Sequence, residues 1–463
     1  MTAPSLIALA TLISSLLSGL LRGKPRAAAL AAAVGAAGTG AFALLVHLEE
    51  PFVGLGLSLK IGGTWTLLGR SLILDEGNRA AVGFLYLAAA FLFGGSWVAR
   101  PGRYFHSVGF ASLGAVAASL MVRPFLFAAV FLELAAMGAV LILARPAPTS
   151  RRGALRLLAL YTSAMLATLL AGWRVEVLGA AGGTPEEALQ ATMLLAVGFS
   201  ILMVVPPFHH WLPAEAESAH PFALAFVAVF LQSAGLFFLL HFLDGYQWLR
   251  DNLQLYHGMR AIGGLMVVAG VLLAAAQTKL VRAVAYALIA DLGILLISIG
   301  ARTSEGYQLA VGLLASHALS LAVCALGLTA LGRLAGEDRE GGRRGVGRRA
   351  PLAAAAAVSG LLSLAGFPLT AGFPARWALL QSLAATDLAS SLAILAGVGV
   401  GGAVALRWLG ILLVDGEGVP AQLRIGERAF LAGGVFFCVL FGTFPQLFAG
   451  IFEAARGFPN LIP

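Results

Sequence analysis

Long apolar runs separated by short polar connections make up most of this sequence. A helix that crosses a bilayer needs about 20 mostly apolar residues. That length selects about fourteen segments, at 3–21, 27–47, 79–99, 105–122, 125–144, 154–172, 189–207, 221–243, 261–277, 283–300, 307–331, 352–373, 386–412 and 429–451. Because lipid offers no hydrogen-bond partner to an open backbone, the pattern predicts an all-α, polytopic membrane protein with about 14 transmembrane helices.

Prolines interrupt two of the predicted helices, the seventh at 204–207 and the twelfth at 365–374. A proline removes a backbone donor and clashes with the preceding turn. Broken helices at matching positions of two halves are typical of transporters built from inverted repeats. The alternative is that each proline only shapes a packed bundle. We predict two inverted five-helix repeats with broken helices 7 and 12.

This pattern divides the chain into four parts. Residues 1–104 hold helices 1–3 and a surface hairpin, which the alternating stretch 55–75 predicts. Residues 105–243 form the first repeat, 258–413 the second, and 414–463 the last helix. The polar stretch 336–349 is expected to be a solvated linker, with contact to anionic lipid headgroups as the alternative.

Composition agrees with a protein whose main solvent is lipid. Of the 463 residues, 59% are hydrophobic and 11% are charged, and the mean hydropathy is +0.91. The net charge of +8 comes from basic residues in short loops, where they act as topology signals, so nucleic acid is not an expected partner. One set of alternate loops holds about 20 Lys and Arg and the other about 10. This imbalance predicts that both termini face outward.

Motifs for bound cofactors or metals are not found in the sequence. It has no GxGxxG loop, P-loop or flavin motif, so redox and nucleotide chemistry would belong to partner subunits. Cys324 and Cys438 lie in apolar runs far apart and are expected to be buried small hydrophobes. We expect no cofactor and no metal. Few lysines beside many Arg, Ala and Gly suggest a GC-rich prokaryote, hence the plasma (inner) membrane.

Ionisable residues inside the apolar segments are the candidates for an ion pathway. Glu133 lies ten residues after Arg123, roughly 15 Å into its helix, and Asp291 lies similarly deep. Such carboxylates normally face a partner or a watery cavity. His317 can both accept and donate a proton, although a lone histidine more often bonds a neighbouring helix. Gln232 is expected to join helices or hold water.

A second polar group follows the seventh helix. It comprises His209, His210, Glu215, Glu217 and His220. Their spacing matches no standard metal motif. We therefore expect a polar vestibule rather than a metal site, with His209 placed in the ion pathway.

At this point the residues resemble a known family. The run PFHHWLPAE at 207–215 is similar to the PLHxWLPDA signature of the antiporter-like membrane subunits of respiratory complex I, which are related to subunits of sodium/proton antiporters and membrane-bound hydrogenases. Four more segments resemble family motifs in the same order, at 131–134, 282–286, 317–320 and 362–376. The resemblance implies proton translocation through a row of buried lysines, histidines and carboxylates. It also implies partners, namely other membrane subunits, lipids and redox or exchange subunits.

The sequence departs from the family pattern at the positions of the family's buried lysines. The family's lysine or histidine positions on helices 7, 8, 11 and 12 fall on Leu202, Gln232, Leu321 and Arg376. Arginine holds a carboxylate but does not release its proton in proteins. An Asp291–Arg376 couple would re-create an acid and cation pair in the second repeat, whereas Glu133 has lost its lysine partner.

Three functional hypotheses remain. The first is an antiporter-like membrane subunit of a multisubunit energy-converting complex, with a proton or cation path that uses Glu133, Asp291, His317 and bound water, with Arg376 fixing the field, and that runs through the second repeat. The second is a degenerate, non-conducting structural or coupling subunit of such a complex. The third is a stand-alone transporter or lipid-handling enzyme, which the short loops disfavour. The sequence leaves open the ion, the complex and whether that complex is an enzyme.

Overall fold

Helices make up nearly all of the structure. A computed structural model describes residues 2–46, 48, 51–54, 57–67, 69–144, 150–181, 185–334, 345–414, 423–448, 450 and 457–462. Most of the predicted linker at 336–349 lies outside these ranges, and its last residues form the short helix α14 (Val346–Arg349).

The first half of the chain contributes ten helices to the described part. They are α1 (Ala3–Leu20), α2 (Pro25–Leu45), α3 (Glu76–Ala99), α4 (Phe105–Met121), α5 (Ala128–Leu143), α6 (Ser150–Ala181), α7 (Pro185–Leu202), α8 (Trp211–Ser218), α9 (Pro221–Gly245) and α10 (Gln247–Arg250).

The second half supplies the remaining long helices. They are α11 (Leu253–Ala276), α12 (Leu280–Gly300), α13 (Ser304–Leu334), α15 (Pro351–Ala365), α16 (Phe373–Leu383), α17 (Leu388–Leu413) and α18 (Ile425–Thr443). Among the described residues, 11 helices are long and apolar enough to cross a membrane, and α4 and α15 are shorter apolar helices. The chain is thus a multi-pass α-helical membrane protein, while the count of fourteen stays a prediction.

Two helices stop at the prolines noted above and resume after a turn. α7 ends at Leu202, and a short 3₁₀ helix at Phe208–His210 leads into α8. α15 ends at Ala365, and α16 begins at Phe373. Left-handed backbone at Val204 in the first interruption and at Gly366 and Leu369 in the second turns the chain where proline has removed helix hydrogen bonds.

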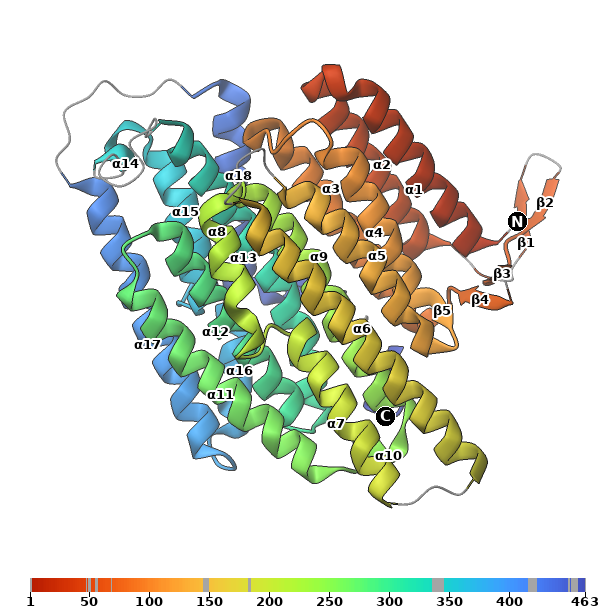
Figure 1. The fold of residues 1–463 in the computed structure, drawn as a ribbon. Helices are drawn as coiled ribbons and strands as arrows, with labels where there is room; N and C mark the ends of the chain where they lie inside the picture. The colour runs from red at the N-terminus through yellow and green to blue at the C-terminus, as the bar shows by residue number, and fades with distance from the viewer. Residues whose placement is uncertain are drawn as a thin grey trace.

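The interior of the bundle is formed by α9, α12 and α13. The most apolar 18-residue stretch of α9 is entirely buried, and 89% of the residues in those of α12 and α13 are buried, against 22–33% in α1, α6, α11 and α18. Figure 1 shows α9, α12 and α13 enclosed by the other helices, with α1–α5 on one side and α14–α18 on the other. Because α9 contacts α4, α5 and α13, and α12 contacts α8, these central helices join the two halves of the chain.

Two small antiparallel sheets lie at one edge of the bundle (Figure 1). β1 (Pro51–Gly54) pairs with β2 (Leu57–Lys60), and β3 (Thr64–Leu67) pairs with β4 (Arg70–Ile73), with Thr64 opposite Ile73. β5 (Val122–Arg123) extends the second sheet. The predicted surface hairpin is therefore present. The four-part division of the chain and the repeat symmetry stay predictions, and α11 begins at Leu253, before the proposed boundary at 258.

Candidate functional site

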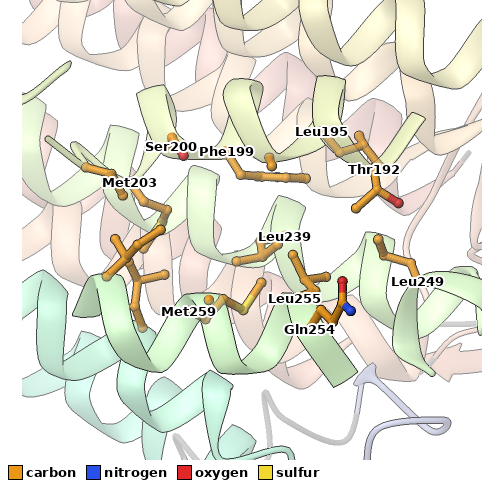
Figure 2. A pocket seen from close by; sticks show the side chains of 15 residues that line it. Thr192, Leu195, Phe199, Ser200, Met203, Leu239, Leu249, Gln254, Leu255 and Met259 are labelled. Carbon is orange, nitrogen blue, oxygen red and sulfur yellow. The ribbon is translucent and has the colours of Figure 1, made fainter. Parts of the chain in front are cut away.

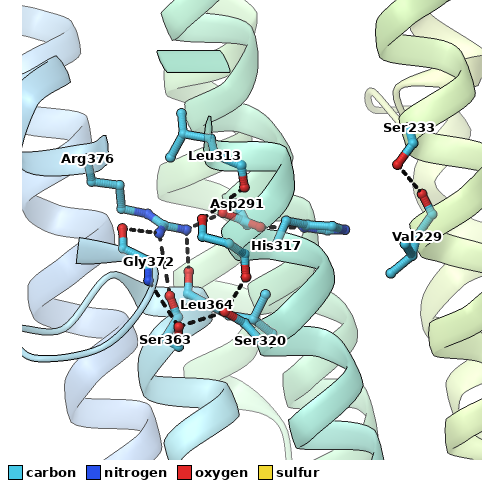
Figure 3. Close-up of polar contacts among 11 residues, drawn as sticks. Val229, Ser233, Asp291, Leu313, His317, Ser320, Ser363, Leu364, Gly372 and Arg376 are labelled. Carbon is cyan, nitrogen blue, oxygen red and sulfur yellow. Dashed lines mark hydrogen bonds and ion pairs between the residues drawn. The ribbon is translucent and has the colours of Figure 1, made fainter. Parts of the chain in front are cut away.

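Three charged or titratable side chains meet in the interior of the second half. Asp291 of α12, His317 of α13 and Arg376 of α16 are each at most 4% exposed. His317 Nδ1 lies 2.5 Å from Asp291 Oδ2, and Arg376 Nη2 donates to Asp291 Oδ1. Figure 3 shows the carboxylate between the guanidinium and the imidazole. We call these residues the Asp291 cluster.

The interruption between α15 and α16 holds Arg376 in place. Nη1 donates to Gly372 O at 2.6 Å and to Ser363 O at 3.4 Å, and Nη2 donates to Leu364 O at 2.7 Å. Helix ends leave carbonyl groups without partners, and the planar guanidinium presents several donors at once. Arg376 therefore closes the break as well as neutralising Asp291. Lysine, with a single ammonium group, has no such fork.

Glycines make room for this arrangement. A Cβ on Gly372 would collide with Ser363 O and with the Arg376 guanidinium, and a Cβ on Gly366 would collide with the Arg376 side chain. Gly366 also has a φ of +77°, which favours glycine. The glycines of the motif at 362–376 thus allow the arginine to lie against the backbone of the break.

Serines connect α13 to the same break. Ser320 Oγ lies 2.6 Å from Ser363 Oγ, which accepts the backbone N–H of Gly372 at 3.0 Å. Ser320 also bonds the Ser316 carbonyl one turn earlier at 2.5 Å. These contacts fix the distance between the helix that carries His317 and the turn that holds Arg376. Sequence reasoning missed these serines, and hydroxyl groups inside apolar helices were the signal that could have found them.

His317 keeps one ring nitrogen available. Within the described part of the chain, the buried His317 Nε2 has no hydrogen-bond partner, and neither does Arg376 Nε. The imidazole extends from Asp291 toward α9 in Figure 3. One nitrogen bound to a carboxylate and one unbound is the arrangement that a proton relay needs, because the ring can take a proton on one side and release it on the other.

The first half has a simpler site. Glu133 of α5 is partly exposed and accepts a hydrogen bond from Thr162 of α6 at 2.6 Å. Its other oxygen has no partner among the described residues, and the same is true of both amide atoms of Gln232 on the buried helix α9. No described arginine or lysine forms an ion pair with Glu133. The structure thus does not join Glu133 to the Asp291 cluster by direct contacts.

Apolar side chains occupy two positions at which the sequence resemblance implies a lysine. Leu202 is buried and packs against the backbone of Gly235 on α9. Leu321 lines a small apolar cavity of about 30 Å³ with Leu212 and Leu288, between α8, α9, α12 and α13. A volume of this size holds on the order of one water molecule. The contact between the halves is therefore apolar around Leu321.

The polar residues after α7 do not form one cluster. The rings of His209 and His210 contact each other at an angle of 37°, with centroids 4.2 Å apart. Glu217 pairs with Arg282 at 3.1 Å near the surface. His220 caps α9 by accepting the N–H of Phe222, and Glu215 is fully buried. No group of three metal-capable side chains occurs in the part of the chain that the structure describes.

A separate apolar cavity of about 230 Å³ lies between α7 and α11 (Figure 2). Leu195, Phe199 and Met203 form one wall, and Leu255 and Met259 form another. It extends to the interruption after α7, where Val205 also contributes. Because apolar side chains dominate its walls, this cavity is not suited to carry an ion.

Comparison with known proteins identifies similar sequences and folds. The sequence model of the family described as "NADH:quinone oxidoreductase/Mrp antiporter, TM" matches residues 178–401. NADH-quinone oxidoreductase subunit N of Salinispora arenicola is 30% identical over 276 residues, 57% of this chain and 53% of the relative. Subunit N 1 of Herpetosiphon aurantiacus is 31% identical over 273 residues, 57% and 54% of the two chains. The chain thus matches about half the length of these curated relatives.

Solved structures share the fold over nearly the whole chain. A chain of the archaeal membrane-bound sulfane sulfur reductase aligns with a TM-score of 0.81 at 17% identity, covering 99% of this chain and 97% of the other. A chain of respiratory complex I from Thermus thermophilus gives 0.78 at 23% identity, with coverage of 99% and 100%. A chain of the Mrp complex from Dietzia gives 0.77 at 16% identity and covers both chains fully. At these identities the likeness concerns the fold.

Proposed function

We propose that this chain, which belongs to the antiporter-like membrane subunits of the NADH:quinone oxidoreductase/Mrp antiporter family, carries protons across the membrane through its second half. It would do so as one subunit of a multisubunit energy-converting complex. The observation that carries this proposal is the buried Asp291 cluster, in which an acid, an imidazole and a fixed cation touch inside the bundle. A structural subunit has no need for buried charge, which is costly in a membrane.

His317 is the residue that takes up and releases the proton in the proposed path. Its Nδ1 bonds Asp291, so the ring is held in one orientation, while Nε2 is available to accept a proton. The ionised Asp291 stabilises the imidazolium that forms, and release of either proton restores the neutral ring. Gln232, on the neighbouring helix α9, would orient water between the halves.

Arg376 serves as a fixed charge in this scheme. Arginine stays protonated in proteins, and here its guanidinium also bonds backbone carbonyls of the break. It therefore offsets the negative charge of Asp291 without taking part in proton transfer. Because both oxygens of Asp291 already face donors, the carboxylate has little capacity left for a sodium ion, which favours protons.

The first half supports a different role. With Leu202 at a family lysine position of this half, and Glu133 bonded only to a threonine, the described residues hold no titratable cation that could drive a proton from Glu133. We therefore assign passage across the membrane to the second half. Partners would be other membrane subunits, lipids and subunits that perform redox or exchange chemistry. The location would be a prokaryotic inner membrane with both termini outside.

Replacement of Asp291 by asparagine tests the proposal. Asp291→Asn removes the charge that stabilises the imidazolium but keeps most of the side-chain volume. Proton translocation by the reconstituted complex should fall at least tenfold while assembly is retained. The control is Asp251→Asn, which alters an exposed acid paired with Arg302 at 3.3 Å and should leave translocation unchanged.

One observation favours the alternative of a non-conducting subunit, namely that buried leucines, Leu202 and Leu321, stand at two family lysine positions. If Asp291→Asn and Asp251→Asn complexes translocate protons equally well, the proposed path is wrong and the structural role is supported.

A further inference from the structure

The apolar cavity between α7 and α11 lies where the two halves of the chain meet (Figure 2). α7 packs mainly against α6 and α9, whereas α11 packs mainly against α12 and α17. Between α7 and α11 the side chains leave a space of about 230 Å³. Its floor includes Leu239 of α9 and Leu296 of α12, which are only 2% and 4% exposed. The cavity thus reaches the buried interior from the side of the bundle.

The mouth of the cavity opens on the outer face of the bundle. Ala196 of α7 and Ile262 of α11 line the cavity and are both exposed. Met193 of α7 and Leu265 of α11 are exposed beside them, and α11 is long and apolar enough to cross a membrane. Apolar side chains on the outer face of a membrane helix meet hydrocarbon. Acyl chains rather than water therefore have access to the mouth.

The cavity runs along the helices for about the depth of one leaflet. On α11, its lining residues extend from Gln254, in the first turn, to Ile262, a rise of roughly 12 Å. The hydrocarbon core is about 30 Å thick, so one leaflet spans about 15 Å. Thr192 and Gln254 lie at one end, and Met203, beside the break after α7, lies toward the other (Figure 2). Hydrogen-bonding side chains thus mark the end nearer the membrane surface.

Water is a poor occupant of this space. An apolar cavity of about 150 Å³ in a protein interior stays dry and binds small apolar molecules, and the cavity between α7 and α11 is larger. An empty cavity also loses the dispersion contacts that its walls would make with an occupant. A flexible acyl chain supplies those contacts and can enter from the side. The shape, the apolar walls and the surrounding medium therefore favour a lipid chain.

We propose that this cavity binds one acyl chain of a membrane phospholipid. The ester group of the chain lies near Thr192 and Gln254, whose side chains can donate hydrogen bonds to its carbonyl. The chain itself fills the space between the two halves and ends beside the break after α7. The lipid is then a structural ligand, and no bond is made or broken. This inference is independent of the proposed function, because a lipid can occupy the cavity whether or not protons pass the Asp291 cluster.

Gly258 offers a way to close the cavity. It lies at the centre of the α11 residues that line the space, and no atom of another segment lies within 4 Å of the position of its missing Cβ. Gly258→Leu therefore places an apolar side chain in the cavity without a clash, and leucine favours a helix more than glycine does. Gly399→Leu on α17 is the matched control, because Gly399 is equally open and does not line this cavity.

Photolabelling in lipid vesicles tests the occupant. The purified complex is reconstituted into phosphatidylcholine vesicles that contain a phosphatidylcholine with a diazirine group midway along one acyl chain. After irradiation, peptide mass spectrometry should find label on the floor residues Leu239 and Leu296, which bulk lipid does not reach because they are buried. Gly258→Leu should lower this labelling at least fivefold, and Gly399→Leu should leave it unchanged. Labelling of the exposed Met193 should be equal in all three proteins.

Two results would overturn the proposal. Label confined to exposed residues such as Met193 in the wild type would mean that the cavity stays empty or that a partner subunit fills it. Equal labelling of the floor in Gly258→Leu and wild type would mean that the chain does not occupy this cavity. The readout is labelling and not transport, so a failure here is distinguishable from normal proton translocation by Asp291→Asn, which would contradict the proposed function alone.

Discussion

Asp291 and Glu133 are both acids in the middle of apolar helices, yet their surroundings differ. Asp291 is almost completely buried, and each of its oxygens faces a nitrogen donor. Glu133 is partly exposed and bonds one threonine hydroxyl, while its second oxygen has no described partner. Depth in a helix therefore does not by itself define a charged site. A cation on a neighbouring element offsets the cost of burying a negative charge.

The two interrupted helices show the same contrast in their backbones. In the break after α15, the guanidinium of Arg376 donates hydrogen bonds to the carbonyls of Ser363, Leu364 and Gly372. After α7, the break is closed by backbone bonds such as Val205 N–H to Ser200 O at 2.8 Å, and Leu202 packs against apolar neighbours. The break after α15 is thus stabilised by a charged side chain, whereas the break after α7 is stabilised by backbone hydrogen bonds.

Removal of Arg376 should produce the largest effect on stability. Arg376→Ala would leave Asp291 buried without a cation and leave the break carbonyls without donors. We expect the free energy of unfolding to fall by about 3–5 kcal/mol. Arg376→Lys should recover only part of this loss, because it restores the charge but not the fork. Thermal unfolding of the purified protein measures both, and equal stability of the alanine variant and wild type would contradict the assigned role.

A methyl group at Gly372 should have the next largest effect. Gly372→Ala places a Cβ against Ser363 O and Arg376, which should displace the guanidinium and lower stability by about 1–3 kcal/mol. Gly399 in α17 has nothing near its missing Cβ, so Gly399→Ala is the matched control. It should be neutral or stabilising by about 0.5–1 kcal/mol. A harmless Gly372→Ala would show that the break does not depend on close packing of the arginine.

The smallest effect is expected in the first half. Thr162→Val removes the one described donor to Glu133 and should lower stability by only about 0.5–1.5 kcal/mol. A chemical-denaturation curve compared with that of wild type measures the change. A loss as large as that of Arg376→Ala would mean that the two halves depend equally on their buried acids.

Much of the fold could be predicted from the apolar pattern. The helical membrane architecture and the hairpin near Thr64–Ile73 are confirmed, and so is the family, which five short motifs suggested. These features depend on local composition, because each membrane helix satisfies its own backbone. The helix count and the inverted repeats stay predictions, since they depend on how segments cross the bilayer.

The contacts within the site are harder to predict from the sequence. The sequence pairs Asp291 with Arg376 as acid and cation, but the second bond of Asp291, to His317, depends on how α12 packs against α13. The pairing of Ser320 with Ser363 depends likewise on α13 and α15. Glu215 was predicted in a vestibule and instead lies buried against α6. Such contacts join residues far apart in the chain, and spacing along one helix does not encode them.

Proton translocation by the reconstituted complex with His317→Gln is the most direct test of the account. Glutamine keeps an N–H that can bond Asp291, but it does not take up a proton. The account predicts an assembled complex whose translocation falls at least tenfold, with partner chemistry retained. Full translocation by an assembled His317→Gln complex would contradict a proton path through the Asp291 cluster.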